Sequence, residues 1–406
     1  MKLPAALLAS ALALMAALAG AAPGTTPPAR LELTHPPGGH GVTVSGASVA
    51  VTGDGSPIVT WAAQEGEDNV LYAARPGQGA PVRVNPPGTS VDSLHQAPGL
   101  VVGPQGELYV TWSSRRPVPV GGLFASDLRL SRSLDGGKTW DGHLRVNDDV
   151  PISHSFEGAA VTPEGTVVLA WIETRDNRAA TLVTRVTERG THVGEALRLD
   201  TGETCVCCRV DVTAGPGENV AVLWRKVFPE NVRDMVLATS RDGGRSFGPP
   251  ALVHADGWKI TACPHRGGSI ATDARGRLYA IWYTEATEGR PDILFATSQD
   301  GKRFSVPRRL HTATASIPDQ ARLAVDRSGR GVVVWEDSTA VRRRVIMRTT
   351  LDGGRTLSPP QTLTQAVKAF APDVVAAPGG FLVVWHEEQF PSIKTVIQSV
   401  KLGDAR

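Results

Sequence analysis

The chain has 406 residues, of which 41% are hydrophobic, and it carries a formal net charge of +2 at neutral pH. This length is enough to bury a large core, and a charge so close to zero, without a long basic run, argues against a nucleic-acid partner. Its 43 glycines and 30 prolines are typical of many short strands joined by turns.

The N-terminus carries a targeting pattern. Lys2 precedes an apolar, alanine-rich run over residues 5–18, and small residues follow at once. This order predicts a cleaved signal peptide over residues 1–21 and a secreted or periplasmic protein, with a retained membrane anchor as the alternative. Residues 22–40 are rich in Pro, Gly and Thr and are predicted to be a tether. Residues 41–406 are predicted to be one domain without a membrane span.

That domain is organised by a repeat in which an alternating apolar run ends in tryptophan, at intervals of 50 to 59 residues. One apolar run precedes each of these runs and two follow it, so each unit has four short strands. The seven tryptophans are Trp61, Trp112, Trp171, Trp224, Trp282, Trp335 and Trp385. Four-stranded units of about 50 residues are typical of propeller blades, so the sequence predicts an all-β, seven-bladed β-propeller.

The last unit, residues 373–400, has only three recognisable strands. Residues 31–34 alternate apolar and polar side chains. We expect them to add the missing outer strand and close the ring, because closure removes two exposed sheet edges. A six-bladed ring with an extra hairpin is the alternative.

A turn of the form Ser/Thr-x-Asp-Gly-Gly follows the third strand of several units, at residues 133–140, 240–247 and 350–357, and in shortened form at 298–304. Asp and Ser or Thr side chains accept backbone hydrogen bonds in such turns, and glycine supplies positive φ. These turns resemble the Asp-box (BNR) repeats of the sialidase-like β-propellers of exported bacterial proteins. Four equivalent carboxylates spread around a ring do not converge on one substrate, so we assign them to the scaffold. They are Asp135, Asp242, Asp300 and Asp352.

The links between one blade's outer strand and the next blade's inner strand reach the mouth of the central channel, where pockets usually form on such scaffolds. In this chain the links are unusually polar. They are residues 93–96, 153–157, 205–209, 263–266, 318–320 and 370–373. We therefore expect the functional site at the channel mouth.

All four cysteines lie on two consecutive links. In an exported protein their even number favours two disulfides, and adjacent blades would bring the links together. A thiolate site for copper or zinc, with a histidine as an added ligand, is the alternative, because soft ligands suit these ions. The residues concerned are Cys205, Cys207, Cys208, Cys263 and His265. The sequence requires no other cofactor.

A set of arginines lies in the same region. Planar guanidinium groups bind carboxylates, so we assign them, with two histidines on the links, to the binding of an anionic sugar. Solvated surface arginines are the alternative. The set is Arg209, Arg225, Arg233, Arg266, His95 and His154.

The sialidase resemblance implies a three-arginine clamp, a Tyr nucleophile activated by Glu, and an Asp acid. The Arg-Ile-Pro motif of that family is missing, and no tyrosine occurs late in the chain. Tyr283 with Glu285 is the available pair, and a packing role for Tyr283 is the alternative. The acid candidates on the links are Glu157, Asp319 and Asp373.

Three functions follow from these patterns. The preferred one is a sialidase-like protein that binds or hydrolyses an anionic glycan at the channel mouth. The alternatives are a periplasmic metal-binding propeller built on the cysteines, and a non-catalytic scaffold that binds a protein partner.

Overall fold

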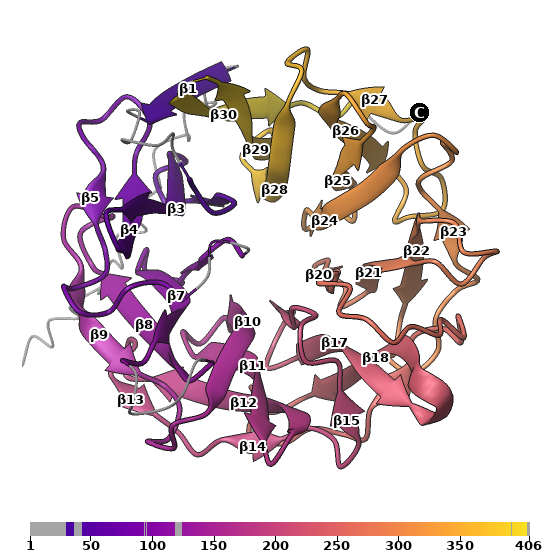
Figure 1. Cartoon of the computed structure of the whole chain (residues 1–406), viewed down its shortest axis with the longest axis horizontal. Coiled ribbons are helices and arrows are strands. Elements are labelled where there is room, and N and C mark those ends of the chain that lie inside the picture. The colour runs from indigo at the N-terminus through magenta and orange to yellow at the C-terminus, as the bar shows by residue number, and fades with distance from the viewer. Residues whose placement is uncertain are drawn as a thin grey trace, which may run out of the picture.

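The computed structural model describes residues 30–35, 43–92, 94, 96–117, 124–390 and 392–403. They form seven small antiparallel sheets arranged as blades around a central axis (Figure 1). The predicted all-β fold and the count of seven blades are confirmed. The described residues contain one helical turn, η1 (Pro229–Asn231), and no helix among them is long and apolar enough to cross a membrane. The predicted signal peptide lies outside the described residues.

In the first, second, third, fifth and sixth blades the strands follow one another in chain order from the centre to the rim (Figure 1). In the fourth blade two short strands pair with the same long strand, and in the seventh the N-terminal strand lies outermost. The first two blades are β2 (Ser48–Val51), β3 (Pro57–Glu65), β4 (Asp68–Ala74) and β5 (Val82–Arg83), then β6 (Gly99–Val102), β7 (Leu108–Arg115), β8 (Ser126–Ser133) and β9 (Asp141–Arg145). The third and fourth are β10 (Ser153–Val161), β11 (Val167–Arg175), β12 (Arg178–Thr187), β13 (His192–Val193) and β14 (Leu197–Arg198), then β15 (Glu203–Thr204), β16 (Asp211–Ala214), β17 (Val220–Phe228), β18 (Val232–Ser240) and β19 (Ala251–Leu252). The fifth and sixth are β20 (Gly268–Thr272), β21 (Leu278–Thr284), β22 (Asp292–Ser298) and β23 (Arg308–Arg309), then β24 (Ile317–Val325), β25 (Gly331–Ser338), β26 (Arg343–Thr350) and β27 (Gln361–Thr362). The seventh is β28 (Ala369–Ala377), β29 (Gly380–Gln389), β30 (Ser392–Val400) and β1 (Arg30–His35).

The seven repeat tryptophans all lie on the second strand of their blades and are at most 2% exposed. Each fills the layer between two blades. Trp112 of the second blade, for example, packs in one cluster with Ile58 and Leu71 of the first. A large aromatic ring at each interface buries much apolar area, which explains why the tryptophan repeat tracks the blade count.

The N-terminal strand closes the ring as predicted. β1 pairs antiparallel with β30, with Leu33 opposite Thr395. Leu31 and Leu33 pack against a cluster that includes Trp61 and Ile397, so the seventh blade joins both ends of the chain. The propeller therefore includes part of the segment predicted to be a tether.

The Asp turns, defined as the four Ser/Thr-x-Asp-Gly turns named above, are held by their own side chains. In the turn at 240–247, the Ser246 backbone N–H donates to Oδ1 of Asp242 at 2.9 Å, and the Ser246 hydroxyl donates to its Oδ2. The Gly244 N–H donates to the Ser240 hydroxyl at 2.9 Å. Both oxygens of the Asp242 carboxylate thus accept hydrogen bonds within the turn, which is the scaffold role expected of it.

Candidate functional site

The predicted links meet at the centre of the ring, where three cavities adjoin. The first, which we call the arginine pocket, has a volume of about 230 Å³. A second of about 410 Å³ shares Gln96, Phe156 and His265 with it, and a third of about 230 Å³ shares Asp319 and Arg322. The main polar and aromatic side chains of the arginine pocket are Arg209, Arg266, Arg322, Asp319, Tyr283, His265 and Phe156.

Four of the links carry a non-glycine residue with positive φ just before or within the inner strand: Phe156, His265, Gln320 and Ala371. In three blades this residue lies in a β-bulge, where the register shifts between Ser155 and Gly158, between Asp319 and Arg322, and between Phe370 and Asp373. A bulge re-aims the side chains that follow it, and strained backbone of this kind gathers at functional sites. The repeated strain singles out the channel mouth.

Three guanidinium groups from consecutive blades line the arginine pocket. Arg209 donates through Nε to the carbonyl oxygen of Glu157 at 3.1 Å. Arg266 pairs with Asp319, with 3.1 Å between Nη2 and Oδ2. Burial and the neighbouring charge of Arg209 lower the pKa of Arg322 to about 10, although Oδ1 of Asp373 lies 4.0 Å from its Nε.

Tyr283 and Glu285 lie beside these arginines. The Tyr283 hydroxyl donates to Oε1 of Glu285, and the Arg266 guanidinium stacks over the phenol ring at 4.3 Å from its centroid. Trp258 packs edge-on against the same ring. Burial and the bond to Glu285 raise the pKa of the Tyr283 phenol, so the phenol is protonated at neutral pH.

The three acid candidates occupy different parts of the channel mouth. Glu157 is 5% exposed and lines the second cavity, where the Ser113 hydroxyl donates to it at 3.1 Å. Burial raises the pKa of Glu157 and of Asp373. Asp319 borders the arginine pocket and the third cavity while paired with Arg266.

Three other members of the predicted binding set, Arg225, Arg233 and His154, do not line the arginine pocket. Arg225 is fully buried and its guanidinium donates to three carbonyl oxygens. Arg233 donates to the carbonyl oxygen of Ala262. His154 is buried on β10, and His95 lies outside the described residues.

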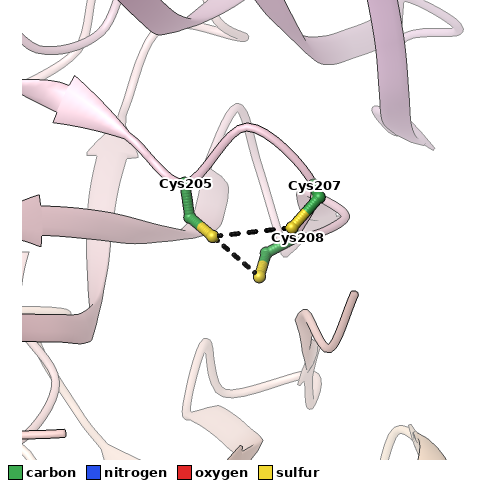
Figure 2. Close-up of side chains that lie close together, drawn as sticks. All are labelled: Cys205, Cys207 and Cys208. Carbon is green, nitrogen blue, oxygen red and sulfur yellow. Dashed lines mark hydrogen bonds between the residues drawn. The ribbon is translucent and has the colours of Figure 1, made fainter. Parts of the chain in front are cut away.

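The cysteines divide into a buried trio and one exposed residue. Figure 2 shows Cys205, Cys207 and Cys208 with their sulfur atoms turned toward one another. The Sγ of Cys205 lies 3.1 Å from that of Cys208 and 4.0 Å from that of Cys207. All four cysteines are free thiols, so the disulfides favoured from the sequence are not formed: the separations within the trio exceed a bond of about 2.0 Å, and Cys263 is exposed while the trio is buried. Cys263 and His265 lie outside the cluster that the three sulfurs form.

Within the trio, Cys205 has the most acidic thiol. The Cys207 and Cys208 thiols donate to its sulfur and lower its pKa, and the Arg225 charge acts in the same direction. Nη1 of Arg233 lies 3.4 Å from the same sulfur. Cys207 also borders the arginine pocket. The trio can therefore present a thiolate within a buried cluster of three sulfur ligands.

Sequence reasoning missed Arg322 because it lies inside a strand rather than on a link. The available signal was its charge, which interrupts the apolar alternation of residues 321–325. The bulge after Asp319 turns this side chain into the channel mouth.

No protein-family profile and no curated protein sequence matches the chain. Among solved structures, an ulvan lyase, which is a polysaccharide lyase, aligns with a TM-score of 0.59 at 11% identity over 86% of this chain and 94% of that one. A Hadza microbial sialidase aligns with a TM-score of 0.52 at 13% identity over 92% and 94% of the two chains. The intramolecular trans-sialidase from Ruminococcus gnavus aligns with a TM-score of 0.52 at 10% identity over 74% and 92%.

At these identities the likeness concerns the fold. The chain is a β-propeller of the type found in sialidases and polysaccharide lyases. Its channel mouth carries the arginines, the Tyr–Glu pair and the cysteine trio described above.

Proposed function

We propose that this protein binds and cleaves an acidic glycan in the arginine pocket. One observation carries the proposal: Arg209, Arg266 and Arg322, from three consecutive blades, line one cavity whose only lining carboxylate among the described residues is that of Asp319. The lining holds three cations and one anion, and Asp373, just outside it, lies 4.0 Å from Nε of Arg322. Guanidinium groups match a carboxylate in charge and planar geometry, so a sugar acid is the ligand that this wall fits.

The solved structures with the same fold support the class of ligand. Two act on sialic acid by their names, and the ulvan lyase was solved with a glucuronate-containing saccharide. Both sugars carry a carboxylate on or next to the ring, which is the group that three arginines would hold.

Tyr283, Glu285 and Glu157 supply the chemistry in this proposal. The Tyr283 oxygen attacks the anomeric carbon while its proton passes to Glu285. The glycosidic bond breaks as Glu157 protonates the leaving oxygen, which requires the glycan to extend from the arginine pocket into the adjoining second cavity. Water then hydrolyses the glycosyl–tyrosine bond. Tyrosine suits an anionic substrate because an ionised carboxylate nucleophile would be repelled by the sugar acid.

We place this activity outside the cytoplasm, in the periplasm or the medium, because of the targeting pattern predicted over residues 1–21. Cell fractionation followed by N-terminal sequencing of the exported protein tests this part. A protein that keeps its first 21 residues and stays in the cytoplasm would contradict it.

The main test measures binding and turnover of sialosides and glucuronate-containing oligosaccharides, with neutral oligosaccharides as the ligand control. Arg322→Met should weaken binding by about 10–100-fold, because charged hydrogen bonds to the ligand are lost. Arg303→Met, which replaces an exposed arginine on an Asp turn, should leave the affinity unchanged. Release of free sugar acid supports hydrolysis, and an unsaturated uronate product would replace that step with elimination. Equal binding of acidic and neutral sugars would refute the proposal.

A second function is favoured by the cysteine trio: binding of a soft metal ion, Cu(I) or Zn²⁺. One ligand atom from each cysteine lies within 4.8 Å of the others, and all three side chains are buried. Thiolates are the ligands that these two ions prefer. Three sulfurs that converge without forming a disulfide are the arrangement such an ion needs.

The metal content of the exported protein tests this function. Native mass spectrometry should show one bound copper or zinc that leaves on denaturation, and Cys207→Ser should lose it. Cys263→Ser, at the exposed cysteine outside the trio, is the matched control and should keep the metal. A protein without bound metal whose mass is lower by two hydrogens for each pair of cysteines would instead establish disulfides.

A further inference from the structure

A second group of candidate ligands lies on the opposite side of β10 from the second cavity. Ser153 and Ser155 line that cavity, and His154 between them points the other way, as alternation along a strand requires. His154 is fully buried and lies directly opposite Glu173 of β11. Asp148, in the connection between β9 and β10, completes the group.

The hydrogen bonding of His154 fixes its chemistry. Its Nδ1 lies 2.8 Å from the carbonyl oxygen of Ser126, an acceptor, so Nδ1 carries a proton and donates it. In the neutral ring, Nε2 is then left with its lone pair. Among the described residues, the buried Nε2 makes no hydrogen bond of regular geometry, and its nearest polar neighbours are two carboxylates. A buried histidine whose first nitrogen is held by a carbonyl and whose second is open has the arrangement of a metal ligand.

Two carboxylate oxygens face this open nitrogen at ligand spacing. Nε2 lies 3.6 Å from Oδ1 of Asp148 and 3.5 Å from Oε2 of Glu173. These distances are long for hydrogen bonds. Ligand atoms about 2.1 Å from a zinc ion, however, stand about 3.4 Å apart at tetrahedral angles. The two separations from Nε2 therefore match the edges of a tetrahedral site, and the two carboxylate oxygens lie within 4.8 Å of each other.

Arg175 orients the two carboxylates from outside the group. Its Nε donates to Oε1 of Glu173 at 2.9 Å, and its Nη2 donates to Oδ2 of Asp148 at 3.2 Å. Each carboxylate thus uses one oxygen for Arg175 and turns the other toward His154, and this second oxygen of Asp148 also accepts from the Val150 N–H at 3.2 Å. Outer hydrogen bonds of this kind hold metal-ligating carboxylates in place.

We propose that Asp148, His154 and Glu173 bind a divalent transition-metal ion, Mn²⁺ or Zn²⁺. One imidazole and two carboxylates suit these ions, and the partly exposed Asp148 leaves a path for entry and for water ligands. The ion would tie the start of β10 to β11 and so stabilise the strand that carries Glu157. This site does not depend on the proposed glycan chemistry, because none of its three ligands lines the arginine pocket.

The test measures metal binding by the full protein after treatment with a chelator. Binding of Mn²⁺ is monitored by its paramagnetic signal, and binding of Zn²⁺ by equilibrium dialysis. Mn²⁺ is the more selective probe, because thiolates such as those of the cysteine trio disfavour it. Wild type should bind one equivalent of Mn²⁺ that Asp148→Asn loses or binds at least tenfold more weakly, and Mn²⁺ should raise the melting temperature of wild type but not of Asp148→Asn. Asp149→Asn is the matched control: it removes the same charge one residue away, where the carboxylate pairs with Arg145.

Glu173→Gln provides a second variant inside the strand and should also lose the equivalent. Binding of either ion that depends on Asp148 but not on Asp149 supports the site. If no binding of either ion depends on Asp148, the proposal is overturned and the three residues form an ion cluster around a protonated His154.

Discussion

Arg225 and Tyr283 are joined through the backbone, because Nη2 of Arg225 donates to the carbonyl oxygen of Tyr283 at 2.7 Å. The same group donates to the carbonyl oxygen of Arg266 at 3.2 Å, and Nη1 donates to that of Arg233 at 2.7 Å. The guanidinium also stacks on Trp258. One buried cation therefore fixes the two segments that carry the Tyr283 phenol and the Arg266 guanidinium to the pocket.

Replacing Arg225 with Met should destabilise the protein and disorganise the arginine pocket. Three carbonyl oxygens lose their donor, and an unpaired buried polar group costs about 1–3 kcal/mol, so we expect the free energy of unfolding to fall by about 3 kcal/mol or more. Urea unfolding measures this change. Arg225→Lys keeps the charge but reaches fewer carbonyls, so its loss should be intermediate. An unfolding midpoint equal to that of wild type for Arg225→Met would contradict the positioning role.

Asp242→Ala tests the scaffold role of the Asp turns. The variant removes the acceptor for Ser246 in a turn far from the channel mouth, which should cost about 1 kcal/mol of stability. Affinity for an acidic sugar should stay unchanged, as measured by calorimetry. Asp242→Asn keeps one acceptor oxygen and should recover part of the loss. A variant as stable as wild type but unable to bind would show that the turn belongs to the site.

The same turns predict how stability depends on acid. Hydrogen bonds from the turns hold the pKa of Asp135, Asp242 and Asp300 at about 2, below the unfolded value of about 3.9. A lowered folded pKa contributes stability that is present above the unfolded pKa and is lost as the pH falls through the folded one. The difference in melting temperature between wild type and Asp242→Ala should therefore shrink between about pH 5 and pH 2. A difference that is constant over this range would show that the carboxylate charge plays no part.

The repeat tryptophans predicted the blade count, and the polar links predicted which segments line the central cavities, because both depend on patterns along the chain. Trp224 and Arg225 show where that approach ends. Their adjacency suggested an arginine free to bind substrate, yet both side chains are buried at a blade interface. Arg322 shows the converse. It lies on a strand, but next to a β-bulge, and its side chain lines the pocket. Register shifts and long-range contacts determine where these two side chains lie, and local periodicity in the sequence predicts neither.

Leu33→Asp tests the closure of the ring. Leu33 packs against the cluster that contains Trp61, and its strand covers the edge of β30. A carboxylate placed there should cost about 2 kcal/mol and expose a strand edge, so we expect a lower melting temperature and a tendency to aggregate. Glu32→Gln, on the other face of the same strand, should change the melting temperature little. Light scattering during heating separates the two variants, and identical traces would argue against closure by β1.

Glu157→Gln separates the cost of a buried carboxyl from its use in catalysis. Burial raises the pKa of Glu157, so the ionised form that prevails above that pKa weakens the folded state. Glutamine removes this penalty while its carbonyl oxygen still accepts from Ser113, so the melting temperature should be equal to or above that of wild type at neutral pH, with a gain that grows as the pH rises. If Glu157 protonates the leaving group, turnover of an acidic glycan should fall at least about 100-fold while the affinity for it is retained. Full turnover with raised stability would remove Glu157 from the mechanism and leave it as a buried carboxyl in the wall of the second cavity.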